Sequence, residues 1–161
     1  MLATIEQKEE NYIVRFERRW DYPVEQVWAW LTENEKLVQW FPELQIEELR
    51  EGGYLKFDMQ DGTFVDMKIT ALAAGKMLEY EWGGDRVRFE LTAVSSGGCR
   101  LALIETIKQI TPHTPKDLAG WDVCMDVIAA LLAGEKVDDR MSIWKVKYEQ
   151  YVKLLEGCAD M

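Results

Sequence analysis

The sequence is poor in residues that bind metals or form disulfides: it has one histidine, His113, and three separated cysteines, Cys99, Cys124 and Cys158. A zinc site needs about three or four His, Cys or carboxylate ligands, and no CxxC or HxxxH spacing occurs, so no metal site is expected. An odd number of distant cysteines is typical of free thiols in a reducing cytoplasm rather than of a disulfide framework. His113 lies in a turn rich in proline and threonine, where an exposed position is favoured over a catalytic one.

Motifs of several enzyme classes are also missing. No serine lies in a GxSxG context, and neither a GxxxxGK[ST] loop nor a GxGxxG turn occurs. Cys124 is surrounded by apolar residues, so we expect it in the core rather than as a nucleophile. No cofactor is expected, and the sequence favours a function other than catalysis.

Basic clusters and long apolar runs are absent as well. The formal net charge is −10 and the isoelectric point is about 4.7, which disfavours binding to nucleic acid or to an anionic membrane surface. There is no run of about 18 apolar residues, and the N-terminal segment MLATIEQKEENY lacks the pattern of a signal peptide. We therefore expect a cytoplasmic protein without membrane insertion.

Apolar and aromatic residues are plentiful. The chain of 161 residues is 48% hydrophobic and has seven tryptophans, which indicates one domain with a large aromatic interior. We predict a single domain over residues 1–161 with a core of about residues 12–155.

Periodicity predicts a mixed fold. After a polar lead-in, residues 12–20 alternate as a strand, and two short helices are expected near 24–31 and 35–40. From Leu44 onward, six alternating segments are joined by short glycine-bearing turns, such as Asp61-Gly62, which is typical of an antiparallel meander. The clean alternation around Met67 places that side chain inside. The sequence therefore predicts an α+β fold with a seven-stranded antiparallel sheet.

A long apolar helix follows the meander. We expect Thr114 to cap it, Gly134 to end it, and a last helix to begin near residue 138 or 139. Within AGWDVCMDVIAALLAG (119–134) only Asp122 and Asp126 are charged, so these two are predicted to form the one strip that faces water.

Four segments carry a resemblance to a known family: PVEQVWAWLTENEKLVQWFP (23–42), EGGYLKFDMQDGTF (51–64), KMLEYEWG (76–83) and AGWDVCMDVIAALLAG. Together they resemble the START-like, or SRPBCC, superfamily with the helix-grip fold. Within it they are most similar to the group resembling the C-terminal domain of the activator of heat-shock protein 90 ATPase. The resemblance implies a curved antiparallel sheet around a long C-terminal helix, with two short helices after the first strand and an apolar cavity between helix and sheet.

We expect ligand contacts from side chains that face this cavity. They are Trp28, Trp40, Phe57, Met67, Tyr80, Trp82, Phe89, Leu103, Glu105, Trp121, Met125 and Ile128. Glu105 shares its strand phase with apolar residues and would then place a carboxyl in the cavity, but the opposite phase is also partly apolar, so a solvent-exposed Glu105 is favoured.

The leading hypothesis is a non-enzymatic protein that binds a small hydrophobic or aromatic ligand. One alternative is a protein-interaction module, either a co-chaperone-like regulator of a heat-shock protein ATPase or a homodimer. The other is a cofactor-free enzyme on an aromatic substrate, which would require an acid or base such as Glu105.

Overall fold

A computed structural model of the chain describes residues 2–159, with side chains for residues 2–157. The thiol of Cys158 therefore lies outside the described part. The elements in chain order are β1 (Thr4–Lys8), β2 (Asn11–Trp20), α1 (Val24–Thr32), α2 (Asn34–Trp40), β3 (Leu44–Glu48), β4 (Tyr54–Asp58), β5 (Phe64–Ala73), β6 (Met77–Trp82), β7 (Asp85–Ala93), β8 (Cys99–Ile107), α3 (Thr114–Leu132) and α4 (Arg140–Ala159). The α+β class is as predicted.

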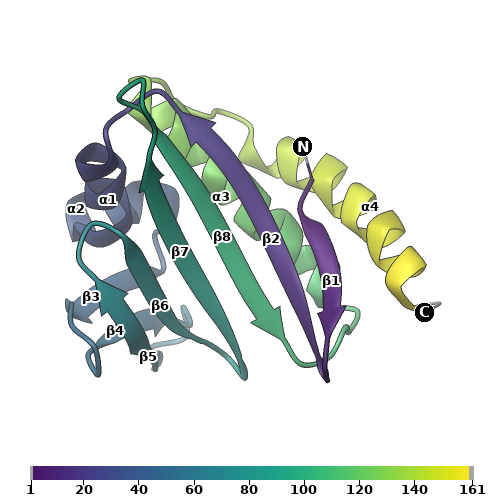
Figure 1. Cartoon of the computed structure of the whole chain (residues 1–161). Helices are drawn as coiled ribbons and strands as arrows, with labels where there is room; N and C mark the ends of the chain where they lie inside the picture. The colour runs from purple at the N-terminus through teal and green to yellow at the C-terminus, as the bar shows by residue number, and fades with distance from the viewer. Residues whose placement is uncertain (1, 160–161) are drawn as a thin grey trace.

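All eight strands form one curved antiparallel sheet in the order β1-β2-β8-β7-β6-β5-β4-β3. Figure 1 shows α3 lying across one face of this sheet, with α4 beside it near β1 and the two short helices at the other end. A β-bulge between Ile69 and Ala71 in β5 interrupts the register with β6, and such bulges bend and twist a sheet. The long helix thus lies on the sheet as the resemblance implied.

The expected strand count of seven is wrong, because the polar lead-in forms a further strand. β1 pairs with β2 from Thr4↔Arg15 to Lys8↔Asn11 and forms one edge of the sheet. Of its five side chains only that of Ile5 is partly buried. The strand is therefore defined by backbone pairing, and its side chains carry no hydrophobic alternation that could reveal it.

Most other elements confirm the predictions made from the periodicity. Val14 and Phe16 are fully buried, Met67 is buried as predicted, and Gly62, with φ of +90°, lies in the turn between β4 and β5. Val65 lies two residues before Met67 on the same face of the strand, yet it is 42% exposed. It lies close to the exposed hairpin turn, where its partner Phe57 is itself only half-buried.

The ends of the two long helices differ in part from the prediction. Thr114 is the first residue of α3 and does not cap it; its hydroxyl accepts a hydrogen bond from the Thr111 amide at 2.9 Å. Gly134 follows the end of α3 with φ of +75°, the left-handed conformation of a helix stop. The start of α4 is as expected, since the Asp139 carboxylate accepts hydrogen bonds from the Ser142 amide and hydroxyl.

Asp122 corrects the prediction of a water-facing strip, because its side chain is fully buried. Its Oδ1 accepts from Arg18 of β2 at 2.8 Å and from Lys147 of α4 at 2.7 Å, and its Oδ2 accepts from the Tyr151 hydroxyl at 2.5 Å. The same hydroxyl accepts from the Ala3 amide at 2.9 Å. Asp126 is 41% exposed at its side chain, as predicted, and lies 3.1 Å from Lys147 Nζ. α4 therefore covers only the Asp122 part of the strip, where one carboxylate links α3 to α4, β2 and, through the Tyr151 hydroxyl, the N-terminal segment.

Among the described residues, no helix is both long and apolar enough to cross a membrane.

Candidate functional site

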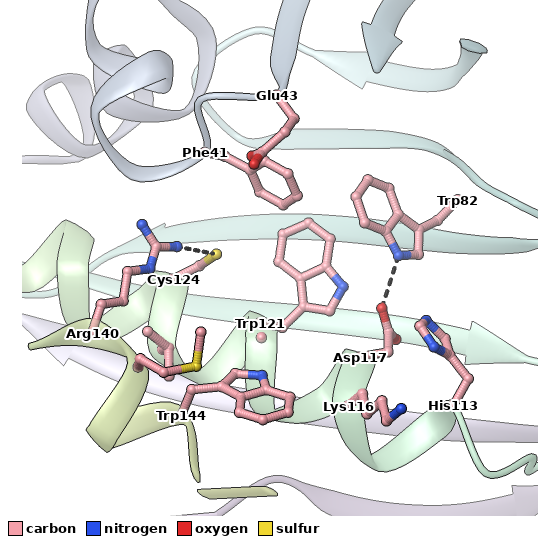
Figure 2. A pocket seen from close by; sticks show the side chains of 13 residues that line it. Phe41, Glu43, Trp82, His113, Lys116, Asp117, Trp121, Cys124, Arg140 and Trp144 are labelled. Carbon is pink, nitrogen blue, oxygen red and sulfur yellow. Dashed lines mark hydrogen bonds between the residues drawn. The ribbon is translucent and has the colours of Figure 1, made fainter. Parts of the chain in front are cut away.

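The candidate site is a pocket of about 500 Å³ between α3, the start of α4, the segment after α2 and the end of β6. Figure 2 shows its walls, to which all four segments contribute side chains. The lining residues are Phe41, Glu43, Trp82, His113, Lys116, Asp117, Gly120, Trp121, Val123, Cys124, Arg140, Met141 and Trp144.

Aromatic rings form the inner wall. The ring centroids of Trp82 and Trp121 are 4.9 Å apart, and Phe41 lies 5.6 Å from Trp82 and 5.7 Å from Trp121. Trp144 from α4 completes the aromatic lining and stacks on Tyr148 at 5.2 Å. Since each ring packs against neighbouring rings, the wall is held in place before any ligand arrives.

One end of the pocket is polar. Asp117 precedes Trp121 by one helical turn, and its Oδ1 accepts a hydrogen bond from Trp82 Nε1 at 2.9 Å. The bond joins α3 to the end of β6 and orients both side chains, as Figure 2 shows. His113 and Lys116 lie at the same end, on the segment that opens α3.

Glu105 lies on the inner face of β8 and corrects the expectation of solvent exposure. It is 1% exposed, and neither of its oxygens has a hydrogen-bond partner in the described structure. Burial first, then the negative charges of Asp117 and Asp85, raise the pKa of Glu105 well above its ordinary value. α3 covers this face of β8, and the resulting burial favours the neutral form of the carboxyl.

The other end of the pocket holds a thiol and a guanidinium. Arg140 Nη2 donates to the Trp40 carbonyl at 2.9 Å and lies 3.4 Å from Cys124 Sγ. Burial raises the pKa of Cys124 to about 12, although Arg140 acts in the opposite direction. The thiol is therefore protonated at neutral pH, in agreement with the core position predicted for Cys124.

The structure distributes the twelve predicted site residues over three places. Trp82 and Trp121 line the pocket, and Phe57 lies behind the wall, 5.7 Å from Trp82 and 6.0 Å from Phe41. Glu105 lies next to Asp117. The remaining eight are packed in or against the core and are not part of the lining: Trp28, Trp40, Met67, Tyr80, Phe89, Leu103, Met125 and Ile128. Of these, Trp40, Tyr80 and Phe89 lie directly behind lining rings, with ring centroids 6.0 Å from Phe41, 6.3 Å from Trp82 and 5.9 Å from Trp121 respectively.

The sequence did not predict several of the residues that line the pocket. Met141 and Trp144 lie on a helix with many charged residues, and Asp117 and Lys116 lie in the first turn of α3, ahead of its apolar stripe. The predicted cavity lay midway along α3, whereas the pocket lies beside its first half. Trp144 could have indicated the pocket from the sequence, because it is a large apolar side chain in a polar helix.

No group of three or more potential metal ligands occurs within residues 2–159 as described.

Comparison with known proteins agrees with this fold. The chain matches the family model described as Activator of Hsp90 ATPase homolog 1-like protein over residues 21–133. No curated protein matches the sequence. The chain is similar to a conserved protein of unknown function from Enterococcus faecalis, with 27% sequence identity and a TM-score of 0.83 over 96% of this chain and 91% of that chain.

Two more distant solved structures share the fold. CalU16 from Micromonospora echinospora has 20% identity and a TM-score of 0.70, covering 95% of this chain and 94% of its own. The Aha1 dimer from Colwellia psychrerythraea has 18% identity and a TM-score of 0.63, covering 74% of this chain and 95% of that one. The family model spans well over half of the residues, so the chain belongs to the Activator of Hsp90 ATPase homolog 1-like protein family.

Proposed function

We propose that this protein binds a small aromatic, largely apolar molecule in the pocket beside α3. The observation that carries the proposal is the convergence of Phe41, Trp82, Trp121 and Trp144 on a space of about 500 Å³. Small-molecule sites usually measure roughly 300–1,000 Å³ and are lined by apolar and aromatic side chains with few polar groups. The pocket has this size and composition.

The partial exposure and fixed position of the aromatic side chains in the pocket wall support binding of a planar ligand. Trp82 and Trp144 are only partly buried, so the pocket offers aromatic faces that a ligand ring could cover. Trp82 is fixed by Asp117 and by its ring neighbours, which lowers the ordering cost that a ligand would have to overcome. Four other hypotheses stay predictions: regulation of a chaperone, homodimer formation, turnover of an aromatic substrate and a cytoplasmic location.

Gly120 provides a direct test, because it lines the pocket from within α3. A Cβ added there would meet no atom within 4 Å, and leucine favours a helix more than glycine does. We expect Gly120→Leu to fill the pocket without loss of folding. In the unmodified chain, aromatic compounds should raise the melting temperature, since a ligand that binds only the native state stabilises it. In Gly120→Leu this shift should disappear.

Gly157→Leu is the matched control. Gly157 is exposed near the end of α4, and an added Cβ would also meet no atom within 4 Å. It follows Trp144 by more than three helical turns, roughly 20 Å along the axis. This variant should bind as the unmodified chain does. Equal ligand-induced shifts in both variants, or no shift from any aromatic compound in the unmodified chain, would refute the proposal.

A further inference from the structure

We infer that the Asp117 end of the pocket recognises a hydroxyl group, so that the ligand is a hydroxylated aromatic compound of the phenol or naphthol class. Asp117 accepts a hydrogen bond from this hydroxyl, and Trp121 Nε1 donates one to it. The inference rests on the proposed function and adds the polar group that the site selects.

The first observation is an indole nitrogen without a partner. Trp121 is 2% exposed and lines the pocket, and its Nε1 has no hydrogen-bond partner in the described structure. Figure 2 shows this nitrogen turned toward the side of the pocket where Trp82 meets Asp117. Leaving a buried donor unpaired is costly, so a ligand atom that accepts its hydrogen bond gains affinity.

The second observation is the free capacity of Asp117. A carboxylate can accept several hydrogen bonds, and Trp82 Nε1 occupies one position on Oδ1. The same bond holds the carboxylate at the pocket wall beside Trp121. A ligand hydroxyl placed between them would donate to the carboxylate and accept from the indole, satisfying both groups at once.

The third observation is the unpaired carboxyl of Glu105 next to Asp117. Two carboxyl groups can share a hydrogen bond only if one of them holds a proton. Glu105 is almost fully buried, whereas Asp117 lines the pocket, and burial raises the pKa of Glu105, which favours the proton on Glu105. Glu105 has no hydrogen-bond partner in the described structure, so we assign it as a positioning residue whose proton can be donated to Asp117 when the two carboxyls approach each other.

Charged ligand groups fit this end less well. An ammonium group cannot accept from Trp121 Nε1, and it would lie near the positive charge of Lys116. A carboxylate could accept from Trp121 but would face the negative charge of Asp117. A neutral hydroxyl is the group that both donates and accepts.

The test compares three ligands of nearly equal shape by equilibrium dialysis, with naphthyl fluorescence as the readout. The ligands are 2-naphthol, which donates and accepts, 2-methoxynaphthalene, which only accepts, and 2-methylnaphthalene, which does neither. We expect 2-naphthol to bind about tenfold or more tightly than 2-methylnaphthalene, the usual effect of a hydrogen bond to a charged group, with 2-methoxynaphthalene between them. Equal affinity for all three would overturn the hydroxyl subsite and leave the proposed function intact, whereas binding of none would overturn both. Tighter binding of 2-naphthylmethylammonium than of 2-naphthol would also overturn the subsite.

Variants separate recognition from folding. Asp117→Asn and Trp121→Phe should each reduce the preference for 2-naphthol severalfold while 2-methylnaphthalene still binds. Glu105→Met should reduce the preference too, whereas Glu105→Gln, which can still donate to Asp117, should retain it. Glu81→Gln is the control, because Glu81 lies next to Trp82 in sequence but its side chain is exposed. An unchanged preference in both Asp117→Asn and Trp121→Phe would refute the assignment.

Discussion

Tyr151→Phe tests the buried connection between the two ends of the chain. The substitution removes one oxygen atom and keeps the ring, which packs edge-on against Phe16 with centroids 6.3 Å apart. The lost oxygen makes two hydrogen bonds, a donated one to Asp122 Oδ2 at 2.5 Å and an accepted one from the Ala3 amide at 2.9 Å. Burial and the nearby Asp122 carboxylate raise the pKa of Tyr151, so the hydroxyl is a proton donor throughout the working pH range.

The expected loss of stability follows from the two groups that lose a hydrogen bond, the Asp122 carboxylate and the Ala3 amide. Asp122 Oδ2 loses its hydrogen bond, and bonds to charged groups contribute about 1.5–3 kcal/mol. The bond from the Ala3 amide contributes about 0.5–1.5 kcal/mol, part of which is regained if β1 moves and water reaches the amide. We expect the free energy of unfolding to fall by about 2–3 kcal/mol.

Urea denaturation followed by tryptophan fluorescence measures this loss, as a lower midpoint at constant slope. Native-state hydrogen exchange should show that the amides of β1 open before those of β8. Tyr148→Phe is the control, since Tyr148 is partly exposed and stacks on Trp144, and it should change stability by no more than about 0.5 kcal/mol. A loss below about 1 kcal/mol in Tyr151→Phe, or unaltered exchange in β1, would refute the argument.

Three other substitutions or treatments give measurable outcomes. Asp122→Ala leaves Arg18 without its carboxylate partner and Lys147 with Asp126 alone, at only 15% and 17% side-chain exposure, so the free energy of unfolding should fall by about 3–5 kcal/mol in urea denaturation; a loss below about 2 kcal/mol would contradict the buried network. The raised pKa of Glu105 means that the folded chain retains a proton which the unfolded chain releases, so stability falls as pH rises above the ordinary value of 4.5 toward the folded-state pKa. Glu105→Gln removes this loss, and its stability relative to the unmodified chain should increase with pH in that window by at most about 1.4 kcal/mol per pH unit; a difference independent of pH would contradict the buried carboxyl. Cys124, with a pKa raised to about 12, should react with iodoacetamide at pH 8 at least about a hundredfold more slowly in the folded than in the unfolded chain, as measured by peptide mass spectrometry; comparable rates would show that the thiol is accessible.

Elements with strong periodicity were predictable. The meander from β3 to β8, the two short helices and the long α3 follow from alternation, glycine turns and a helical apolar stripe, because burial on one face selects such patterns. β1 was not predictable in this way. Its segment is polar on both faces, and it is held by pairing with β2 and by the hydroxyl of Tyr151, a residue far along the chain.

The same limit applies to the buried carboxylates. Asp122 and Glu105 each lie in an apolar stretch, and periodicity assigns a charged residue to water unless a partner is known. The partners of Asp122 come from β2 and α4, and Glu105 is buried under α3 with no hydrogen-bond partner in the described structure. Such contacts depend on the three-dimensional arrangement. The position of the pocket toward one end of α3, rather than at its middle, depends on it too and was not predictable for the same reason.

The strand order has a consequence for how the chain folds. β3 to β8 are joined by local hairpins and can form in succession, but β2 pairs with β8, from Tyr12↔Ile107 to Trp20↔Cys99. Closing so long a loop is slow, since its entropic cost precedes any gain from contacts. During synthesis the first two strands therefore emerge early and wait for β8. Their hairpin gains the hydrogen bond from Tyr151 only when α4, which follows all eight described strands in the sequence, packs beside them.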